Sequence, residues 1–251
     1  MERLDGRAAV VTGAASGIGL AVATALAAEG VRVLLTDHDA AALDVAVDGV
    51  RALVEGADVD GMVVDVRDPD AVEAAADRAV ERFGGLHIAM SNAGIVNGGP
   101  AWELPLEEWH RVLDVNLWGV IHGIRAFVPR ILATGEEGHV VNTGSRASVV
   151  AHGGLGPYTV AKHGVLALSD VLRKDLQAAG APVGVSIVMP GAIRTGMNPL
   201  GDIEPATVAA NVVDAIRTGR RYVFTDDQGN DGVRRRLGAI VDALDEVLPP
   251  T

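Results

Sequence analysis

The amino-acid sequence predicts an α/β fold, a single doubly wound domain with a parallel sheet of about seven strands and helices on both faces. Short apolar runs alternate along the chain with longer, Ala-rich segments of helical periodicity. Most of the runs are too continuous for strands with one face in water, so they indicate strands buried on both faces. No linker, repeat or change of composition interrupts this order, and we expect residues 1–251 to form one domain.

The expected strands and helices follow one another in alternation. The strands are Ala8–Val11, Val31–Leu35, Met62–Val66, Leu86–Met90, His139–Asn142, Val183–Met189 and Arg221–Phe224. The helices are Leu20–Glu29, Ala40–Val54, Asp70–Phe83, Leu106–Leu132, Pro157–Ala178 and Pro205–Thr218. Glycine follows several of these helices, and proline stands where two of them begin, as is typical of helix ends. Such alternation requires right-handed crossovers between parallel strands, which is the Rossmann-type arrangement. Residues 226–251 form a C-terminal extension, with one more helix expected from Gly232 to Leu248.

Composition and charge exclude several classes of protein. Hydrophobic residues are 49% and charged residues 22% of the sequence, which is ordinary for a folded domain and wrong for a disordered chain. The absence of cysteine excludes disulfides, zinc–thiolate sites and a catalytic thiol. The net charge of -12 repels nucleic acid and anionic membrane surfaces. No stretch suits a signal peptide or a membrane span, so we expect a cytoplasmic protein without nucleic-acid or membrane partners.

A glycine-rich segment follows the first strand and opens the first helix. Gly13, Gly17 and Gly19 let the chain turn tightly and bring its backbone against a pyrophosphate, while the helix N-terminus offers unpaired N–H groups and a positive dipole end. The spacing of the glycines differs from that of the commonest dinucleotide-binding motif. The segment also lacks the lysine of a Walker A loop, which binds nucleoside triphosphates. A plain tight turn is the alternative interpretation.

Asp37 strengthens the dinucleotide interpretation and indicates which dinucleotide binds. It ends the second expected strand, where a carboxylate can bind the hydroxyls of the adenosine ribose and repel the 2′-phosphate of NADP. Neither Thr36 nor His38 supplies a permanent cation that would favour that phosphate. The sequence therefore favours NAD over NADP. Asp37 could instead cap the next helix, but Asp39 is at least as well placed for that role.

Tyr158 and Lys162 form the second chemical signal. The chain has only two tyrosines and two lysines, yet one of each stands four residues apart, on one face of an expected helix. A nearby ammonium favours the phenolate, so we expect Lys162 to lower the pKa of Tyr158 and make it a proton donor and acceptor. An ordinary amphipathic helix pair is the alternative. No nucleophile elbow surrounds Ser16 or Ser145, and no histidine or carboxylate spacing fits a metal site, so we expect neither a serine hydrolase nor a bound metal.

These motifs resemble the short-chain dehydrogenase/reductase family from about Gly6 to Phe224. The glycine-rich segment matches the family's Thr-Gly-x-x-x-Gly-x-Gly at Thr12 to Gly19. Four further family motifs match at Asp65-Val66, at Asn92-Ala93-Gly94, at the catalytic residues Asn116, Ser145, Tyr158 and Lys162, and at Pro190, Gly191 and Thr195.

The resemblance implies an NAD(P)-dependent alcohol dehydrogenase that interconverts a secondary alcohol and a ketone. Tyr158 would exchange the hydroxyl proton, Lys162 would bind the nicotinamide ribose, and Ser145 would hold the substrate oxygen. Asn116 would support a water that relays the proton to solvent. The residues expected to bind the cofactor are Gly13, Ser16, Gly17, Ile18, Gly19, Asp37, Asp65, Val66, Asn92, Ala93, Gly94, Tyr158, Lys162, Pro190, Gly191, Ile193 and Thr195.

The substrate site is expected to be apolar. Family geometry places five residues near the substrate, and two more lie in a segment, residues 190–204, that we expect to cover it as a lid; an ordinary packed loop is the alternative. A cation, Arg146, follows Ser145 and either faces the substrate or is a surface or inter-subunit charge. We expect a bulky apolar or alicyclic alcohol of peripheral or secondary metabolism. The candidates are Val96, Trp102, Arg146, Val149, Val150, Leu155, Met197 and Leu200.

Two other functions remain open from the sequence. An NADPH-linked biosynthetic ketoreductase of the 3-oxoacyl type is disfavoured by Asp37 and by the C-terminal extension. A non-catalytic dinucleotide-binding regulator is disfavoured by the intact set of Asn, Ser, Tyr and Lys. The resemblance also implies a homo-oligomer, a tetramer or a dimer, in which the helices Leu106–Leu132 and Pro157–Ala178 pack against symmetry mates through apolar residues such as Val112 and Leu172.

Overall fold

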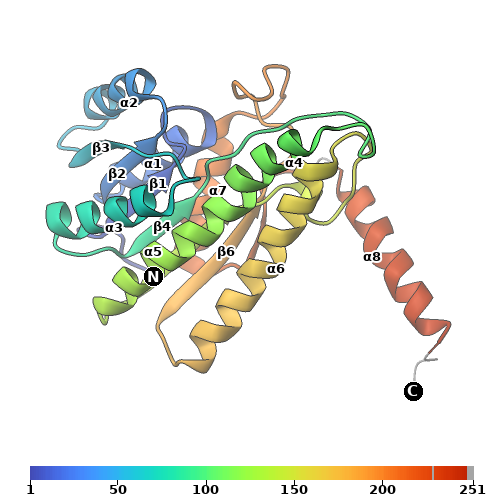
Figure 1. Ribbon diagram of the computed structural model, residues 1–251. Helices are drawn as coiled ribbons and strands as arrows, with labels where there is room; N and C mark the ends of the chain where they lie inside the picture. Colours follow the sequence, from blue (N-terminus) through green and yellow to red (C-terminus); the bar gives the residue numbers. More distant parts are fainter. Residues whose placement is uncertain (228, 248–251) are drawn as a thin grey trace.

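Seven parallel strands form one sheet at the centre of the protein (Figure 1). The computed structural model describes residues 1–227 and 229–247. The order across the sheet is β3-β2-β1-β4-β5-β6-β7, and every neighbouring pair is parallel. The order reverses between β1 and β4, which opens a crevice beyond the carboxyl ends of these strands. The strands are β1 Ala8–Thr12, β2 Arg32–Asp37, β3 Val59–Val63, β4 Ile88–Ser91, β5 Gly138–Thr143, β6 Val183–Met189 and β7 Tyr222–Phe224.

Helices cover both faces of the sheet, as the alternation of the sequence predicts. On one face α1, α2 and α7 bury aliphatic side chains such as Leu26 and Val212. On the other face α3, α5 and α6 bury Phe83, Phe127 and Leu172. The single α/β domain with a seven-stranded parallel sheet is therefore confirmed. The helices are α1 Gly17–Ala28, α2 Ala40–Leu53, α3 Pro69–Phe83, α4 Leu106–Leu113, α5 Gly119–Ala133, α6 Gly156–Ala178, α7 Pro205–Thr218 and α8 Asn230–Asp245.

The third strand differs from its prediction. We expect it at Met62–Val66, but β3 occupies Val59–Val63, where Val59 is buried and Gly61 and Val63 are exposed. It lies at the edge of the sheet, paired with β2, and it is less buried than the central strands β1 and β5. Val64 and Val66 are buried in the turn that follows the strand, and their apolar side chains account for the shifted prediction.

The expected helix Leu106–Leu132 is divided by one wide turn. Residues Asp114–Trp118 form a π-helical segment between α4 and α5, and they include the buried Asn116. A π-bulge adds a residue to the turn and is frequent at functional sites. A short 3₁₀ helix, Arg146–Ser148, also follows β5 and was not expected. The predicted last helix begins slightly earlier, at Asn230, and its predicted end, Leu248, lies outside the described residues.

No helix within residues 1–227 and 229–247 is both long enough and apolar enough to span a membrane.

Candidate active site

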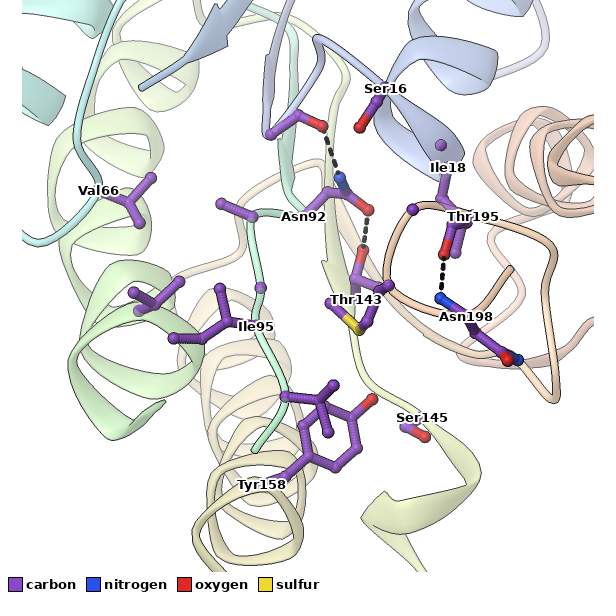
Figure 2. Close-up of a pocket in the computed structure, with 18 of the residues that line it drawn as sticks. Ser16, Ile18, Val66, Asn92, Ile95, Thr143, Ser145, Tyr158, Thr195 and Asn198 are labelled. Carbon is purple, nitrogen blue, oxygen red and sulfur yellow. Dashed lines mark hydrogen bonds between the residues drawn. The ribbon is translucent and has the colours of Figure 1, made fainter. Parts of the chain in front are cut away.

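A cleft of about 780 Å3 lies at the carboxyl ends of the strands. Its walls come from the turn after β1, the ends of β2, β4 and β5, the start of α6 and the segment after β6 (Figure 2). Ser16 and Ile18 lie at one end, and Ser145 and Tyr158 lie at the other (Figure 2). The cleft therefore joins the predicted dinucleotide loop to the predicted catalytic residues.

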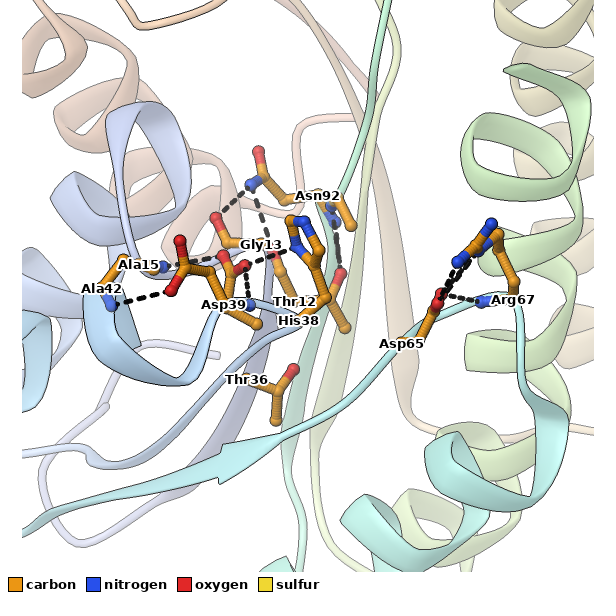
Figure 3. Close-up of polar contacts among 12 residues, drawn as sticks. Thr12, Gly13, Ala15, Thr36, His38, Asp39, Ala42, Asp65, Arg67 and Asn92 are labelled. Atoms are coloured by element: carbon orange, nitrogen blue, oxygen red, sulfur yellow. Dashed lines mark hydrogen bonds and ion pairs between the residues drawn. The ribbon is translucent and has the colours of Figure 1, made fainter. Parts of the chain in front are cut away.

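The glycine-rich turn is held against the segment after β4. The side-chain amide of Asn92 donates hydrogen bonds to the carbonyls of Thr12 and Gly13, at 3.1 and 3.2 Å (Figure 3). Gly13 has a φ of +63°, and a β-carbon there would lie 2.8 Å from the Cα of Ala93. Gly19 does not line the cleft, and a β-carbon there would lie 2.1 Å from the carbonyl oxygen of Gly13. Gly19 thus contributes close packing of α1 on the turn rather than contact with a ligand.

The first turn of α1 presents its backbone N–H groups to the cleft. Ser16 precedes the helix, but its side chain does not cap it. Gly17 and Ile18 both line the cleft. The first N–H groups of a helix have no partners within the helix, and with its dipole they favour an anion. A dinucleotide pyrophosphate fits this cradle.

Asp37 lines the same end of the cleft and is joined to the glycine-rich turn. One carboxylate oxygen accepts a hydrogen bond from the backbone N–H of Ala15 at 3.1 Å. The other accepts from the N–H of Asp39 at 3.2 Å and contacts His38 Nδ1 at 2.9 Å. Asp39, not Asp37, caps α2, because its side chain accepts from the N–H of Ala42. The carboxylate of Asp37 is therefore fixed at the cleft where the sequence predicts the adenosine ribose.

Asp65 and Val66 line the cleft as predicted, but Asp65 has a partner that the sequence analysis missed. Arg67 binds both of its carboxylate oxygens, with Nε at 3.0 and 2.9 Å and Nη2 at 2.5 Å. The hydrogen bond from Arg67 holds the pKa of Asp65 below its usual value, against the opposing effect of burial. Val64, Val66 and Val115 line the cleft nearby. They offer an apolar slot for a flat aromatic base beside the ion pair.

The catalytic candidates come together at the other end of the cleft. Lys162 is buried within α6, and its Nζ donates a hydrogen bond to the carbonyl of Thr143 at 2.8 Å. The same Nζ lies 5.7 Å from the centre of the Tyr158 ring. Tyr158 is hydrogen-bonded to Ser145. Three polar side chains, from the end of β5 and from α6, thus converge on one region of the cleft.

A family model described as short chain dehydrogenase matches residues 7–202. The chain belongs to the short-chain dehydrogenase family. Two 1-deoxy-11-beta-hydroxypentalenate dehydrogenases support this membership. The one from Streptomyces avermitilis is 41% identical over 248 residues, with 92% of this chain and 87% of that protein covered. The one from Streptomyces exfoliatus is 38% identical over 264 residues, with 98% and 92% covered.

The fold agrees equally well with a solved structure of the family. A short chain dehydrogenase/reductase from Burkholderia phymatum, crystallised in complex with NAD, has a TM-score of 0.92 and is 35% identical over 96% of both chains. The predicted family and the predicted alcohol dehydrogenase are therefore confirmed. The dinucleotide-binding character of the fold is confirmed with them.

The environment of Tyr158 corrects one expectation about this short-chain dehydrogenase. Burial raises the pKa of Tyr158, and the hydrogen bond with Ser145 opposes that increase only in part. The expected lowering by Lys162 does not dominate this shift, and the Lys162 ammonium donates to the carbonyl of Thr143 at 2.8 Å. Burial also lowers the pKa of Lys162, to about 8. Both side chains are consequently less inclined to carry charge than free tyrosine and lysine.

Asn116 is fully buried and does not line the cleft. Its side-chain oxygen accepts a hydrogen bond from the N–H of Ile95 at 2.8 Å, and its side-chain nitrogen donates to the carbonyl of Ile95 at 2.8 Å. A β-carbon on Gly94 would lie 3.3 Å from that oxygen. Asn116 therefore fixes the backbone of Ile95, which itself lines the cleft, and its support of a relay water stays a prediction.

Three of the eight predicted substrate residues, Val96, Leu155 and Met197, line the cleft. Trp102 and Leu200 do not, because they project into solvent and are 84% and 91% exposed. Val149 packs against the core behind β6, and Val150 lies near Gly232 at the start of α8. Arg146 also differs from our expectation. Its guanidinium is buried and bonded to Asp226 and Asn230. It therefore neither faces the cleft nor forms a surface charge.

Apart from Gly19, all the residues that we expect to bind the cofactor line the cleft. Sequence analysis missed ten lining residues, most of them next to a motif residue in the chain. Their proximity to a motif was the available signal for His38, Arg67 and Gly144, whereas Arg111 and Asn198 stand in no motif. The ten are His38, Val64, Arg67, Ile95, Arg111, Val115, Thr143, Gly144, Gly196 and Asn198.

Proposed function

We propose that this enzyme is an NAD-dependent dehydrogenase that interconverts a bulky, apolar or alicyclic secondary alcohol and its ketone. The observation that carries the proposal is one cleft with Asp37 and the glycine-rich turn at one end and Ser145, Tyr158 and Lys162 at the other. A bound nicotinamide would supply the hydride chemistry. The residues that would hold it include Gly17, Asn92 and Thr195, which line the cleft between the two ends.

The protein's own groups divide the remaining tasks. The hydroxyl of Ser145 would hold the substrate oxygen, and the hydroxyl of Tyr158 would exchange a proton with that oxygen. Because burial raises the pKa of Tyr158, the phenol is protonated at neutral pH and ready to donate to a ketone. Alcohol oxidation needs the phenolate as acceptor, so its rate should increase with pH. Lys162, one turn along α6, would bind the nicotinamide ribose.

The preference for NAD rests on Asp37. Its carboxylate is hydrogen-bonded to Ala15 N–H and would repel the 2′-phosphate of NADP. His38 is the adjacent side chain, and it contacts the same carboxylate. We expect NAD to bind at least about tenfold more tightly than NADP, which corresponds to about 1.4 kcal/mol. Asp37→Ser with His38→Arg should narrow or reverse that preference, whereas Asp39→Ser, which keeps a capping side chain on α2 and leaves Asp37 in place, should not. Equal use of the two cofactors by the unmodified enzyme would refute the proposal.

The substrate end of the cleft supports a neutral, bulky alcohol. Ile95, Val96, Leu155 and Met197 line it, and Arg146 is directed elsewhere. The name of the Streptomyces relatives describes a hydroxylated acid, which supports a secondary-metabolism substrate of this size. Arg146 does not reach this region, and Arg111, which lines the cleft, is already paired with Glu108 at 2.7 Å, so this enzyme should not need a carboxylate on its substrate. Alicyclic alcohols should therefore show a higher kcat/KM than propan-2-ol, and an added carboxylate should not improve it.

The catalytic assignment can be tested with controls that the chain itself provides. Tyr158→Phe should lower kcat by orders of magnitude while NAD still binds, and Lys162→Arg should be damaging because a guanidinium cannot occupy the ammonium's position. The only other tyrosine, Tyr222, lies on β7 and donates to Asp170. Lys174, the other lysine, is exposed on α6 and does not line the cleft. Tyr222→Phe and Lys174→Arg should therefore leave turnover unchanged. Near-normal turnover by Tyr158→Phe would contradict the assignment.

Two alternatives give different results in the same assays. A biosynthetic NADPH-linked ketoreductase would prefer NADPH and 3-oxoacyl substrates, and a non-catalytic regulator would bind dinucleotide without turnover. A cytoplasmic location remains a prediction from the sequence.

Assembly also remains a proposal, with one change of detail. Val112 and Leu172, expected between subunits, are buried within the chain. The exposed apolar residues on α4 to α6 and the segment between them are Leu106, Trp118, Leu132, Val160 and Val171. They support a homo-oligomer, a dimer or a tetramer, formed through these helices.

A further inference from the structure

Helix α8 leaves the body of the domain. It points away from the sheet and the other helices (Figure 1). Its first turn is anchored, because Val233 is buried and a β-carbon on Gly232 would lie 3.9 Å from Val150. Asn230 accepts a hydrogen bond from the Arg146 guanidinium at 2.7 Å. Beyond this anchor, no helix or strand of the described part of the chain packs along α8.

A row of large apolar side chains follows the unpacked part of α8. Leu237, Ile240, Val241 and Leu244 are each between 48% and 55% exposed. Their spacing of three, one and three residues places them on one face of the helix. Single apolar residues on a surface are ordinary, but a continuous row of four marks a surface that binds something.

The three arginines of α8 and most of its carboxylates lie in different halves of the helix. Arg234, Arg235 and Arg236 lie before the apolar row, together with Asp231, whereas Asp242 lies within the row and Asp245 and Glu246 lie beyond its end. Arg234 and Asp245 are eleven residues apart, about three turns, so they lie on the same flank of the row. Among the described residues, Arg234 is paired with the exposed Asp231 at 3.3 Å. Such exposed pairs contribute little, so Arg234 can exchange its partner at little cost.

We propose that α8 pairs with α8 of a second copy of this chain, antiparallel across a two-fold axis. A two-fold interface uses the same surface on both subunits, so that surface must be complementary to itself. In the antiparallel pair, Leu237 faces Leu244 of the partner subunit and Ile240 faces Val241 of the partner subunit. Arg234 then lies within reach of Asp245 of the partner subunit. A parallel pair would bring arginines to arginines and carboxylates to carboxylates.

Nucleic acid and membranes fit the exposed face of α8 less well than a second copy of the chain. The net charge of -12 repels nucleic acid and anionic membranes, although the arginines alone would attract them. The α8 surface is also separate from the exposed residues of α4 to α6. If both surfaces form two-fold interfaces, their combination gives a closed tetramer, and α8 accounts for one of its interfaces. This inference does not depend on the catalytic proposal.

The test is the mass of the full-length protein in solution at micromolar concentration, measured by light scattering and sedimentation equilibrium. Ile240→Lys, in the middle of the row, should reduce the assembled mass by a factor of about two. Arg235→Glu is the matched control, because position 235 is about 140° around the helix from position 240. That variant should keep the unmodified mass.

Exchange of the charges tests the antiparallel arrangement. Arg234→Glu alone and Asp245→Arg alone should each weaken the assembly, and the double variant should restore it, because each arginine again meets a carboxylate. A monomeric unmodified protein, or an Ile240→Lys protein of unchanged mass, would overturn the proposal. Failure of the double variant to recover would overturn the antiparallel pairing. Binding of anionic vesicles that is lost in Ile240→Lys, with mass unaffected, would assign the helix to a membrane surface instead.

Discussion

Arg146 and Asp226 form an ion pair that is almost completely buried, with side chains 10% and 8% exposed. The guanidinium also donates to the backbone carbonyl of Asp226 and to Asn230 Oδ1, both at 2.7 Å. Asp226 Oδ2 accepts a hydrogen bond from the N–H of Gly191 at 3.0 Å. Burial raises the pKa of Asp226, but hydrogen bonds from Thr225, Gly191 and Arg146 outweigh it and hold the pKa below its usual value. The pair therefore connects the residue after Ser145, the start of the segment after β6, and the start of α8.

Removing one member of this pair should be costly. Arg146→Met leaves the Asp226 carboxylate buried without its cation, and we expect a loss of about 3–5 kcal/mol in the free energy of unfolding. We also expect kcat to fall by about tenfold, since Ser145 is the next residue and small displacements of catalytic groups are costly. Urea unfolding and steady-state kinetics measure the two effects.

A double variant separates charge burial from simple loss of packing. Arg146→Met with Asp226→Asn removes both charges and should recover part of the lost stability. Arg235→Met, on the exposed side of α8 away from the apolar row, should change stability by less than about 0.5 kcal/mol. If the double variant is no more stable than Arg146→Met, the loss of stability in Arg146→Met does not come from the unpaired charge of Asp226.

The buried Lys162 ammonium should lower the free energy of unfolding of the enzyme, although the proposed catalysis needs this lysine. Burial lowers its pKa from 10.5 to about 8, so below pH 8 the folded protein holds a buried ammonium that the unfolded chain would solvate. This shift in pKa corresponds to a loss of about 3 kcal/mol in the free energy of unfolding. The hydrogen bond from Lys162 to Thr143 offsets about 1 kcal/mol of that loss. Lys162→Met should therefore be inactive but more stable at pH 7.

The dependence of that gain on pH follows from the direction of the shift. Between pH 8 and 10.5 the folded protein releases the Lys162 proton while the unfolded chain retains it, so the unmodified enzyme gains stability as the pH increases. The advantage of Lys162→Met should thus be largest at pH 7 and should shrink toward pH 10. Chemical unfolding at several pH values measures it. A constant difference across that range would contradict the buried-ammonium account.

His139 should make the fold sensitive to acid. It is buried in β5, and its Nε2 lies 2.8 Å from Ser186 Oγ, which itself donates to the carbonyl of Arg220. Ser186 must therefore accept from Nε2–H, and Nδ1 faces Gly184, where a β-carbon would lie 2.5 Å from it. Burial lowers the pKa of His139 from 6.5 to about 4.

The folded protein consequently binds fewer protons than the unfolded chain between pH 4 and 6.5. The stabilisation is complete above pH 6.5 and is lost as the pH falls toward 4, by about 3 kcal/mol. His139→Gln keeps a donor for Ser186 and should flatten this part of the stability profile. His110→Gln, on the exposed side of α4, should leave it unchanged. An equally steep acid transition in His139→Gln would exclude His139 as its cause.

The sequence was most informative where a function depends on local spacing. Gly13, Asp37, Tyr158 and Lys162 belong to short motifs, and the cleft contains all four. Asp226 could not be found in this way, because it is 80 residues from Arg146 and only the fold brings them together. The π-helical turn around Asn116 has no apolar pattern that distinguishes it from an ordinary helix. The position of β3 at the edge of the sheet depends on which strands pair, and the local sequence does not show which strands pair.

The segment from residue 190 to 204 is expected to act as a lid, and its glycines have different roles in the structure. Gly191 leaves room for Asp226, since a β-carbon would lie 2.7 Å from Oδ1. At Gly201 a β-carbon would lie 2.4 Å from the carbonyl carbon of Ile193. Gly196 has open space around it. Two of the three glycines are therefore required for packing, whether or not the segment moves.

Alanine substitutions should distinguish packing from hinge motion. Gly201→Ala should push Ile193 and its neighbour Arg194 away from the chain near Ile203, to which Arg194 N–H donates at 2.7 Å. Because Ile193 and Thr195 line the cleft, the KM for the dinucleotide should increase by about tenfold or more, a loss of about 1.4 kcal/mol in binding. Gly196→Ala meets no neighbour and should change KM and kcat less than about twofold, within the ordinary effect of a surface substitution. The opposite pattern, with Gly196→Ala lowering kcat and Gly201→Ala tolerated, would mean that backbone freedom at Gly196, rather than packing at Gly201, governs this segment.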